Sequence, residues 1–223
     1  MTPKAIIAAI VVVVAGVLGV ALFLSSGTGH TVFVPDDAAR HREKGEFLLN
    51  KRRHTTDRQK KAELLSQAIG EFKKAIESKP DFEVAYNMLG HCYMEKGQWE
   101  SSLVNLNHAI KLRSDYPAAL YNRGHVYQRL SVGRRDHELI DQAIADYKAA
   151  SVSELAVGII GDIHKSLADA YNQKGETDKA IAELKTYLKK APHAQDAVLV
   201  RRKIRGLTLM QKGKAPDLGA PIE

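Results

Sequence analysis

The chain is poor in the residues that build disulfide-rich, collagen-like or aromatic-rich β proteins. Its single cysteine, Cys92, excludes an intrachain disulfide and a thiolate metal cluster. Sixteen glycines and seven prolines in 223 residues are too few for a collagen-like or linker-dominated chain. Aromatic residues make up only 6%, fewer than a sandwich or barrel of short aromatic-rich strands needs. With 44% apolar and 26% charged residues, the composition predicts a packed globular region.

Acidic residues are in deficit. The 33 Lys and Arg residues outnumber the 26 Asp and Glu residues, so the formal net charge is +7 and the isoelectric point is near 9.4. This modest excess would allow an anionic partner such as lipid head groups or an acidic protein. We expect no nucleic acid partner, because no aromatic platform or recognised motif interleaves with the cations.

Residues 5–24 form a long apolar run, AIIAAIVVVVAGVLGVALFL, without a charged residue. Twenty helical residues span about 30 Å, the thickness of the hydrocarbon core of a bilayer. The run is longer than the apolar region of a cleaved secretory signal, and the residues that follow it offer no small-residue cleavage site. The sequence therefore predicts a short tail at 1–4 and an uncleaved transmembrane signal-anchor helix at 5–24, through which the chain contacts membrane lipid.

The charges that flank this run favour a cytoplasmic N-terminus. Lys4 and the chain terminus lie on one side, whereas residues 25–39 contain no Lys or Arg. A wider window brings in Arg40, Arg42 and Lys44 and argues for the reverse orientation. We favour the first reading, which places the rest of the chain outside the cytoplasm, in the periplasm if the source is bacterial.

A period of 34 residues runs through the remainder of the chain. Gly90 and Gly124 lie 34 residues apart, and each is followed directly by His and three residues later by Tyr. In a third copy, Ala168 and Tyr171 stand in the same relation. Apolar residues at i, i+4 and i+7 follow each copy, and turn signals such as Lys96-Gly97 separate the segments. The pattern predicts pairs of amphipathic helices.

These residues resemble the tetratricopeptide repeat (TPR) family, a helix–turn–helix unit with Gly or Ala where the paired helices cross. Residues at positions typical of the family are Pro80, Tyr86, Leu89, Gly90, Tyr93, Gly97, Ala109 and Pro192. The resemblance implies an all-α, TPR-like, right-handed helical solenoid over residues 37–192. The sequence departs from the family pattern at Ser102, at Arg123 and at Ser114, which stand for Ala, an apolar residue and Pro.

The repeat pattern sets the expected boundaries. After a linker at 25–36, four TPR-like repeats are predicted at about 37–80, 81–115, 116–155 and 156–192, enough to bury a continuous core. The first and third repeats carry insertions, 51–62 and 131–139, which we expect to add a loop and one or two turns to the second helix. Residues 193–211 are predicted to form a capping helix with an apolar stripe, and 212–223 a flexible tail.

Residues that could carry chemistry are few. The sequence contains no phosphate-binding loop, dinucleotide fingerprint, zinc-protease motif or nucleophile elbow. His91 and Cys92 are adjacent, so their side chains point about 100° apart on a helix and do not readily share a proton, and Cys92 is expected to be buried and inert. His91 and His125 share one repeat position, but two imidazoles without a third ligand make a poor metal site. We expect no catalytic residue, metal, cofactor or small-molecule substrate.

The resemblance further implies that the first helix of each repeat lines a concave groove that binds a protein partner. The groove residues implied in this chain are Arg42, Glu46, Asn87, His91, Tyr121, His125, Gln128, Lys165, Asp169 and Asn172. Asn and Gln can bond an extended peptide, Tyr can stack, and Lys or Arg can hold carboxylates. A clamp for chaperone C-termini is not expected, because Ala118 and Asn122 stand where it needs cations.

The strongest charge run is predicted to be a basic loop that contacts lipid or an acidic partner. Its cations are Lys51, Arg52, Arg53, Arg58, Lys60 and Lys61. Together these features favour a membrane-anchored TPR scaffold or adaptor that binds a protein and supports assembly of a membrane or envelope complex. The alternatives are a permanent structural accessory subunit of a large membrane complex and, from another class, a His/Cys-dependent enzyme or metal-binding protein.

Overall fold

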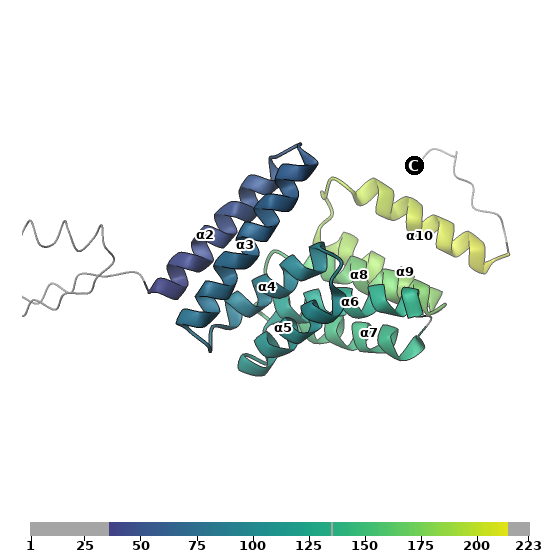
Figure 1. Cartoon of the computed structure of the whole chain (residues 1–223). Coiled ribbons are helices and arrows are strands. Elements are labelled where there is room, and N and C mark those ends of the chain that lie inside the picture. The colour runs from purple at the N-terminus through teal and green to yellow at the C-terminus, as the bar shows by residue number, and fades with distance from the viewer. Residues whose placement is uncertain (1–35, 135, 214–223) are drawn as a thin grey trace, which may run out of the picture.

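The computed structural model describes residues 36–134 and 136–213 (Figure 1). The predicted tail, the transmembrane helix and nearly all of the linker lie outside these residues, as does most of the predicted C-terminal tail. Among the helices that are described, none has the length and apolar character needed to cross a bilayer. The helices are α2 (Asp37–Arg53), α3 (Arg58–Ser78), α4 (Glu83–Glu95), α5 (Trp99–Leu112), α6 (Pro117–Arg134), α7 (His137–Val152), α8 (Ile160–Gln173), α9 (Thr177–Lys190) and α10 (Ala197–Gln211).

The helices pack as consecutive antiparallel pairs. The pairs are α2 with α3, α4 with α5, α6 with α7 and α8 with α9, and α10 packs on α9 at the end of the array (Figure 1). Each pair falls inside one of the repeat ranges that the sequence predicts. The described residues contain no strand, so the prediction of an all-α, TPR-like solenoid is confirmed.

Glycine occupies the points where the helices of a pair cross. A Cβ added at Gly124 would lie 2.6 Å from Cε1 of Tyr147, and one added at Gly90 would lie 2.7 Å from Cγ of Leu106. Both contacts are too short for real side chains. The 34-residue recurrence of glycine in the sequence therefore reflects a steric requirement of helix crossing.

Two departures from the family pattern have structural partners. Ser102, which replaces the usual alanine, is fully buried and its hydroxyl donates a hydrogen bond of 2.7 Å to the carbonyl oxygen of Gly90. Arg123, which replaces an apolar residue, binds Asp146 through two parallel hydrogen bonds of 2.8 and 2.7 Å. Each polar side chain joins the two helices of its own pair, so neither leaves a buried group unsatisfied.

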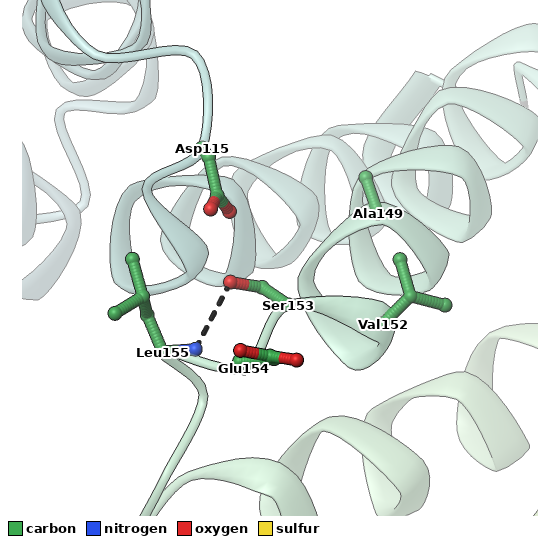
Figure 2. Close-up of a pocket in the computed structure, with 6 residues that line it drawn as sticks. All are labelled: Asp115, Ala149, Val152, Ser153, Glu154 and Leu155. Carbon is green, nitrogen blue, oxygen red and sulfur yellow. Dashed lines mark hydrogen bonds between the residues drawn. The ribbon is translucent and has the colours of Figure 1, made fainter.

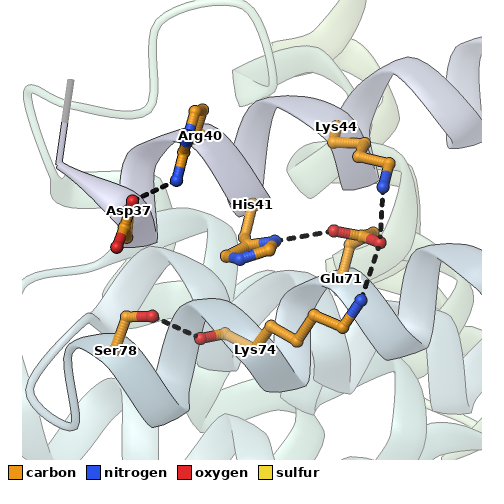
Figure 3. Close-up of polar contacts among 7 residues, drawn as sticks. All are labelled: Asp37, Arg40, His41, Lys44, Glu71, Lys74 and Ser78. Carbon is orange, nitrogen blue, oxygen red and sulfur yellow. Dashed lines mark hydrogen bonds and ion pairs between the residues drawn. The ribbon is translucent and has the colours of Figure 1, made fainter. Parts of the chain in front are cut away.

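Polar contacts between the two helices of a pair recur in other repeats. In each, a carboxylate on the second helix contacts a cationic or imidazole group on the first. In the first pair, Glu71 accepts hydrogen bonds from His41 Nδ1 at 2.7 Å and from Lys44 Nζ at 2.9 Å (Figure 3). In the fourth pair, His164 Nδ1 lies 2.7 Å from Glu183 Oε2. Polar contacts between paired helices thus supplement the apolar core.

The first helices of the later repeats form one continuous layer. Helix α4 contacts α6, and α6 contacts α8, whereas α5, α7 and α9 make no comparable contact with one another in the described region. An array in which only one layer is closely spaced curves toward that layer. We call the surface formed by α4, α6 and α8 the first-helix face. Helix α2 packs mainly on α3, and the first pair leans away from the others (Figure 1).

The prediction of a basic loop at the first insertion is wrong. Lys51, Arg52 and Arg53 form the last turn of α2, and Arg58, Lys60 and Lys61 lie in the first turn of α3. Only residues 54–57 connect the two helices. Helix formation continues through the insertion because the Asp57 side chain accepts a hydrogen bond of 2.9 Å from the Lys60 backbone N–H and caps α3. The inserted residues lengthen both helices of the pair, not the second alone.

Candidate functional site

The middle of the first-helix face holds a cluster of ring side chains. His125, on α6, packs edge-on against Tyr121 and Tyr147, with ring centroids 4.6 and 5.5 Å away. Its Nε2 lies 3.3 Å from Oγ of Ser166 on α8. We call His91, Tyr121, His125, Tyr147 and Ser166 the central cluster. It draws on α4, α6, α7 and α8, so stacking of three repeats is needed to build it.

Burial controls the protonation of this cluster. Burial lowers the pKa of His125, and the nearby Arg129 lowers it further, so the imidazole is neutral at pH 7. Burial also lowers the pKa of His91, although Glu95 acts in the opposite direction. The half-buried groups of the central cluster are thus the neutral imidazoles of His91 and His125 and the phenol of Tyr121, which can both donate and accept hydrogen bonds, whereas Tyr147 is fully buried.

His91 has hydrogen-bonding capacity left over. Its Nδ1 is shielded from solvent and has no hydrogen-bond partner among the described residues, while the side chain as a whole is half-buried. Arg52 and Arg53, at the end of α2, lower the pKa of His91 further, whereas Glu95 raises it. Arg52 is held by Glu95 at 2.9 Å, but Arg53 is exposed. The charged groups that act on His91 thus come from the end of α2 and from α4 itself.

Asn87 has a structural role that the sequence did not reveal. It is only 4% exposed, its amide nitrogen donates to the hydroxyl of Tyr116 at 3.3 Å, and its amide oxygen accepts from Asn122 at 2.9 Å. Both halves of the amide are thus used inside the protein. The expectation that Asn87 lies exposed in the groove is wrong, because the turn before α6 brings a tyrosine over it.

The α8 part of the predicted groove is occupied by the capping helix. Lys165 pairs with Asp196, directly before α10, at 2.9 Å, and Asp169 pairs with Lys203 of α10. Burial disfavours the charged amine, but hydrogen bonds to Asp196 and Asp162 outweigh it and raise the pKa of Lys165. These two charges therefore hold α10 in place, and neither is free to hold a partner's charges.

The remaining predicted positions differ in how available they are. Arg42 binds both carboxylate oxygens of Glu46 at 2.8 Å, so these two residues of α2 satisfy each other. Gln128 accepts a hydrogen bond of 2.9 Å from the hydroxyl of Tyr147 and is half-buried at the edge of the central cluster. Asn172 is exposed on α8. Of the ten predicted positions, the structure brings His91, Tyr121, His125 and Gln128 together in one region.

Three residues of this region were missed by sequence reasoning. Tyr147 occupies a core position of the second helix, and nothing in the repeat pattern shows that its hydroxyl reaches Gln128. Ser166 lies two residues before Ala168 in the third copy of the repeat, at a position for which the pattern predicts no role. Arg129 lies on the first helix of its repeat, four residues after His125, and this position is the one feature of the sequence that indicates its place beside the cluster. A map of helix faces, rather than of family positions, would have found Arg129.

Cys92 is buried, as predicted. Its side chain is 0% exposed, and burial, together with Glu95, raises the pKa of the thiol to about 12. Within residues 36–134 and 136–213, no three His, Cys, Asp or Glu side chains lie close enough to hold a metal ion. The thiol is therefore protonated at neutral pH and out of reach of the solvent.

A separate depression lies away from the first-helix face. It has a volume of about 530 Å³ and lies between the turn before α6 and the end of α7 (Figure 2). Its lining residues are Asp115, Ala149, Val152, Ser153, Glu154 and Leu155. The Ser153 hydroxyl oxygen accepts a hydrogen bond of 3.2 Å from the backbone N–H of Leu155, and the Val152 side chain is 83% exposed. The depression is open and offers two carboxylates without an opposing cation, so it has no evident catalytic chemistry.

Comparisons with known sequences agree with the repeat assignment. The TPR repeat family model matches residues 90–131. DnaJ homolog subfamily C member 3 of Homo sapiens is 29% identical over 112 residues, which cover 50% of this chain and 19% of that protein. The Bos taurus protein matches to the same extent. The chain thus matches only about a fifth of the length of these relatives.

Solved structures share the fold. MamA 41-end from Desulfovibrio magneticus RS-1 matches with a TM-score of 0.61 at 14% identity, over 79% of this chain and 86% of that one. Pseudomonas aeruginosa pilF gives 0.62 at 15% identity, over 79% and 69%. TTC0263, a thermophilic TPR protein of Thermus thermophilus, gives 0.52 at 21% identity, over 77% and 99%. At these identities the likeness concerns the fold.

The stacked helix pairs, the glycine crossings and the capping helix define an all-α repeat protein of the solenoid class. The TPR repeat family model matches residues 90–131, and the described residues share the fold of known TPR structures.

Proposed function

We propose that this protein is a scaffold that binds a protein partner on the middle of its first-helix face and supports assembly of a membrane or envelope complex. The observation that carries the proposal is the central cluster on the first-helix face, where neutral rings lie beside an imidazole nitrogen that has no hydrogen-bond partner among the described residues. Half-buried rings at a concave surface provide contact area at low entropic cost, which is typical of binding sites.

Binding, and not catalysis, is the role that this chemistry supports. The thiol of Cys92 is buried and protonated, so it supplies no nucleophile at neutral pH. His125 lies within hydrogen-bonding distance of the Ser166 hydroxyl, but no carboxylate forms a hydrogen bond with the imidazole in the described part of the chain. A base without an orienting group makes a weak catalytic unit. The membrane part of the proposal rests on the predicted transmembrane helix at 5–24.

The partner is expected to contact α4 and α6 more than α8. The charges of α8 are already paired with α10, whereas Arg53 and Arg129 flank the central cluster and are exposed. A peptide that stacks on Tyr121 and places acidic or carbonyl oxygens near these cations fits this arrangement.

Site-specific photo-crosslinking tests the proposal. A benzophenone amino acid placed at Arg129 or at Asn172 reports contacts on the first-helix face, and the same probe at Val104 or Lys111 of α5 reports the opposite layer. The full chain is expressed in its native membranes and irradiated. We expect the same partner adduct from the two first-helix positions and none from α5. Equal adducts from both layers would refute the proposed surface.

A matched pair of variants then tests the role of the ring. Tyr121→Ala should strongly reduce the adduct, whereas Tyr121→Phe, which keeps the ring and its packing on His125, should retain it. Circular dichroism at 222 nm serves as the folding control for both variants. An adduct of unchanged yield in folded Tyr121→Ala would show that the ring does not contact the partner.

A further inference from the structure

Helix α10 has a second apolar face that is not used in the fold. Ala197, Val200 and Leu207 are buried against the last pair. On the other side, Val198 is 51% exposed, Leu199 is 61% exposed and Met210 is 60% exposed. The outer face of a helix that caps a solenoid is expected to be polar, because it faces water. Three large aliphatic side chains in water on one short helix require another explanation.

Arginines share this outer face. Positions 198, 202, 205 and 209 follow the i, i+4, i+7, i+11 spacing of one helical stripe, which carries Val198, Arg202 and Arg205. Leu199 and Met210 border it on the adjacent stripe, 199, 203, 206 and 210. Arg201 borders the stripe. All three arginines are exposed, and none has an acidic partner in the part of the chain that the structure describes. By contrast, the neighbouring Lys203 is paired with Asp169.

The surroundings add to the positive charge. Lys189 and Lys190 form the basic last turn of α9 and are exposed, and Lys212 lies at the end of α10. Of the nearby acidic groups, Asp196 is paired with Lys165, whereas Asp178 keeps its charge because its hydrogen-bond donor, Gln211, is neutral. The end of the array formed by α9 and α10 is therefore a cationic surface with aliphatic side chains projecting from it.

We propose that the outer face of α10 binds the surface of an anionic lipid bilayer. The arginines would hold head-group phosphates, and Val198, Leu199 and Met210 would enter the boundary between head groups and acyl chains. A terminal helix with aliphatic and cationic side chains on its exposed side matches the pattern of helices that lie in a membrane interface. The proposed span at 5–24 would keep the chain at a bilayer, and α10, at the far end of the array from α2, would provide a second contact (Figure 1). The proposal does not depend on partner binding.

Depth-dependent fluorescence quenching tests it. The full chain, carrying Cys92→Ala, receives an environment-sensitive fluorophore at Met210→Cys and is reconstituted in nanodiscs that contain brominated phosphatidylcholine. We expect quenching by the brominated acyl chains when phosphatidylglycerol is included, and little when phosphatidylcholine is the only lipid. The same probe at Val104→Cys, an equally exposed aliphatic position on α5, should not be quenched.

Charge variants complete the test. Replacing Arg201, Arg202 and Arg205 by serine should abolish the quenching, whereas lysine at the same positions should retain it. A control with serine at Lys73, Lys96 and Lys111 removes the same charge from other exposed sites and should behave like the parent. The proposal would be overturned if quenching were absent, if it were equal in neutral lipid, or if the serine variant left it unchanged. An absence of quenching would indicate an acidic protein as the occupant instead. None of these outcomes affects the crosslinks from the first-helix face.

Discussion

Replacing Glu71 by glutamine is expected to destabilise the first helix pair selectively. The Glu71 side chain is 8% exposed and binds three groups: His41 at 2.7 Å, Lys44 at 2.9 Å and Lys74 at 3.3 Å (Figure 3). Burial alone would raise its pKa, but these hydrogen bonds outweigh burial and lower the pKa from 4.5 to about 2. The carboxylate form is thus favoured by the fold.

The size of the effect follows from this lowered pKa. A group at about 2 in the folded chain and 4.5 in the unfolded chain stabilises the fold by at most roughly 3 kcal/mol at neutral pH. Because the lysine side chains are 62% and 53% exposed, water screens part of the interaction. We expect Glu71→Gln to lower the free energy of unfolding of this pair by about 1–3 kcal/mol.

The pH dependence has a definite sign. Since the folded pKa is the lower one, the stabilisation is complete above the unfolded value of 4.5 and is lost as pH falls from about 5 toward 2. The parent should therefore lose stability across this window, and Glu71→Gln should lose less. The charge-matched control is Glu63→Gln on the same helix, whose pair with Lys60 is about half exposed and should contribute under about 0.5 kcal/mol.

Hydrogen–deuterium exchange of the full chain in detergent is the direct assay. Repeat arrays are held by neighbour contacts, so weakening one pair should speed amide exchange in α2 and α3 before it affects α8 and α9. Glu63→Gln should exchange like the parent. If the two variants exchange alike, or if the parent and Glu71→Gln share one pH profile between 5 and 2, the carboxylate does not hold the pair together as described.

Three further predictions concern single positions. Gly124→Ala should lower the free energy of unfolding by about 1–3 kcal/mol, because the added Cβ would lie 2.6 Å from the Tyr147 ring. Gly133→Ala should raise it by about 0.5–1 kcal/mol, because no atom lies within 4 Å of the added Cβ. A thermal unfolding experiment that ranks the two variants in the opposite order contradicts the crossing argument. Cys92 should resist labelling by a maleimide in the folded chain and react once the chain is denatured, as measured by mass spectrometry. Fast labelling of the folded chain would show that Cys92 is not buried. An NMR titration should give His125 a pKa below 6.5, because burial favours the neutral imidazole. The stabilisation from the neutral form is therefore complete above pH 6.5 and is lost as the pH falls. A measured pKa above 6.5 would contradict the buried position of His125.

The repeat architecture could be predicted because its requirements are local and periodic. Gly90 and Gly124 recur 34 residues apart because a Cβ at either crossing would clash, and Gly97 and Gly175 end turns at a positive φ. The capping helix was predictable for a similar reason, as Val200 and Leu207 mark one apolar face. The predicted transmembrane helix lies outside the described residues and stays a prediction.

The site was less predictable, because it depends on contacts between residues far apart in the sequence. Family positions correctly placed His91, Tyr121 and His125 in one layer, but they gave no sign that Tyr116 would cover Asn87 or that α10 would occupy the charges of α8. The basic run was predicted as a loop on polarity alone. Strong helix formers and a capping Asp57 extended both helices through it instead.

Exchange mapping of the captured complex tests the central claim most directly. After crosslinking at Arg129, the bound and free chains are compared for amide exchange, with the partner's peptides excluded by mass. Protection on the first-helix face, strongest in α4 and α6 and lost in Tyr121→Ala, is the predicted result. Protection concentrated on α5 and α7 would show that the partner binds the opposite layer, and the first-helix face would then not be the binding site.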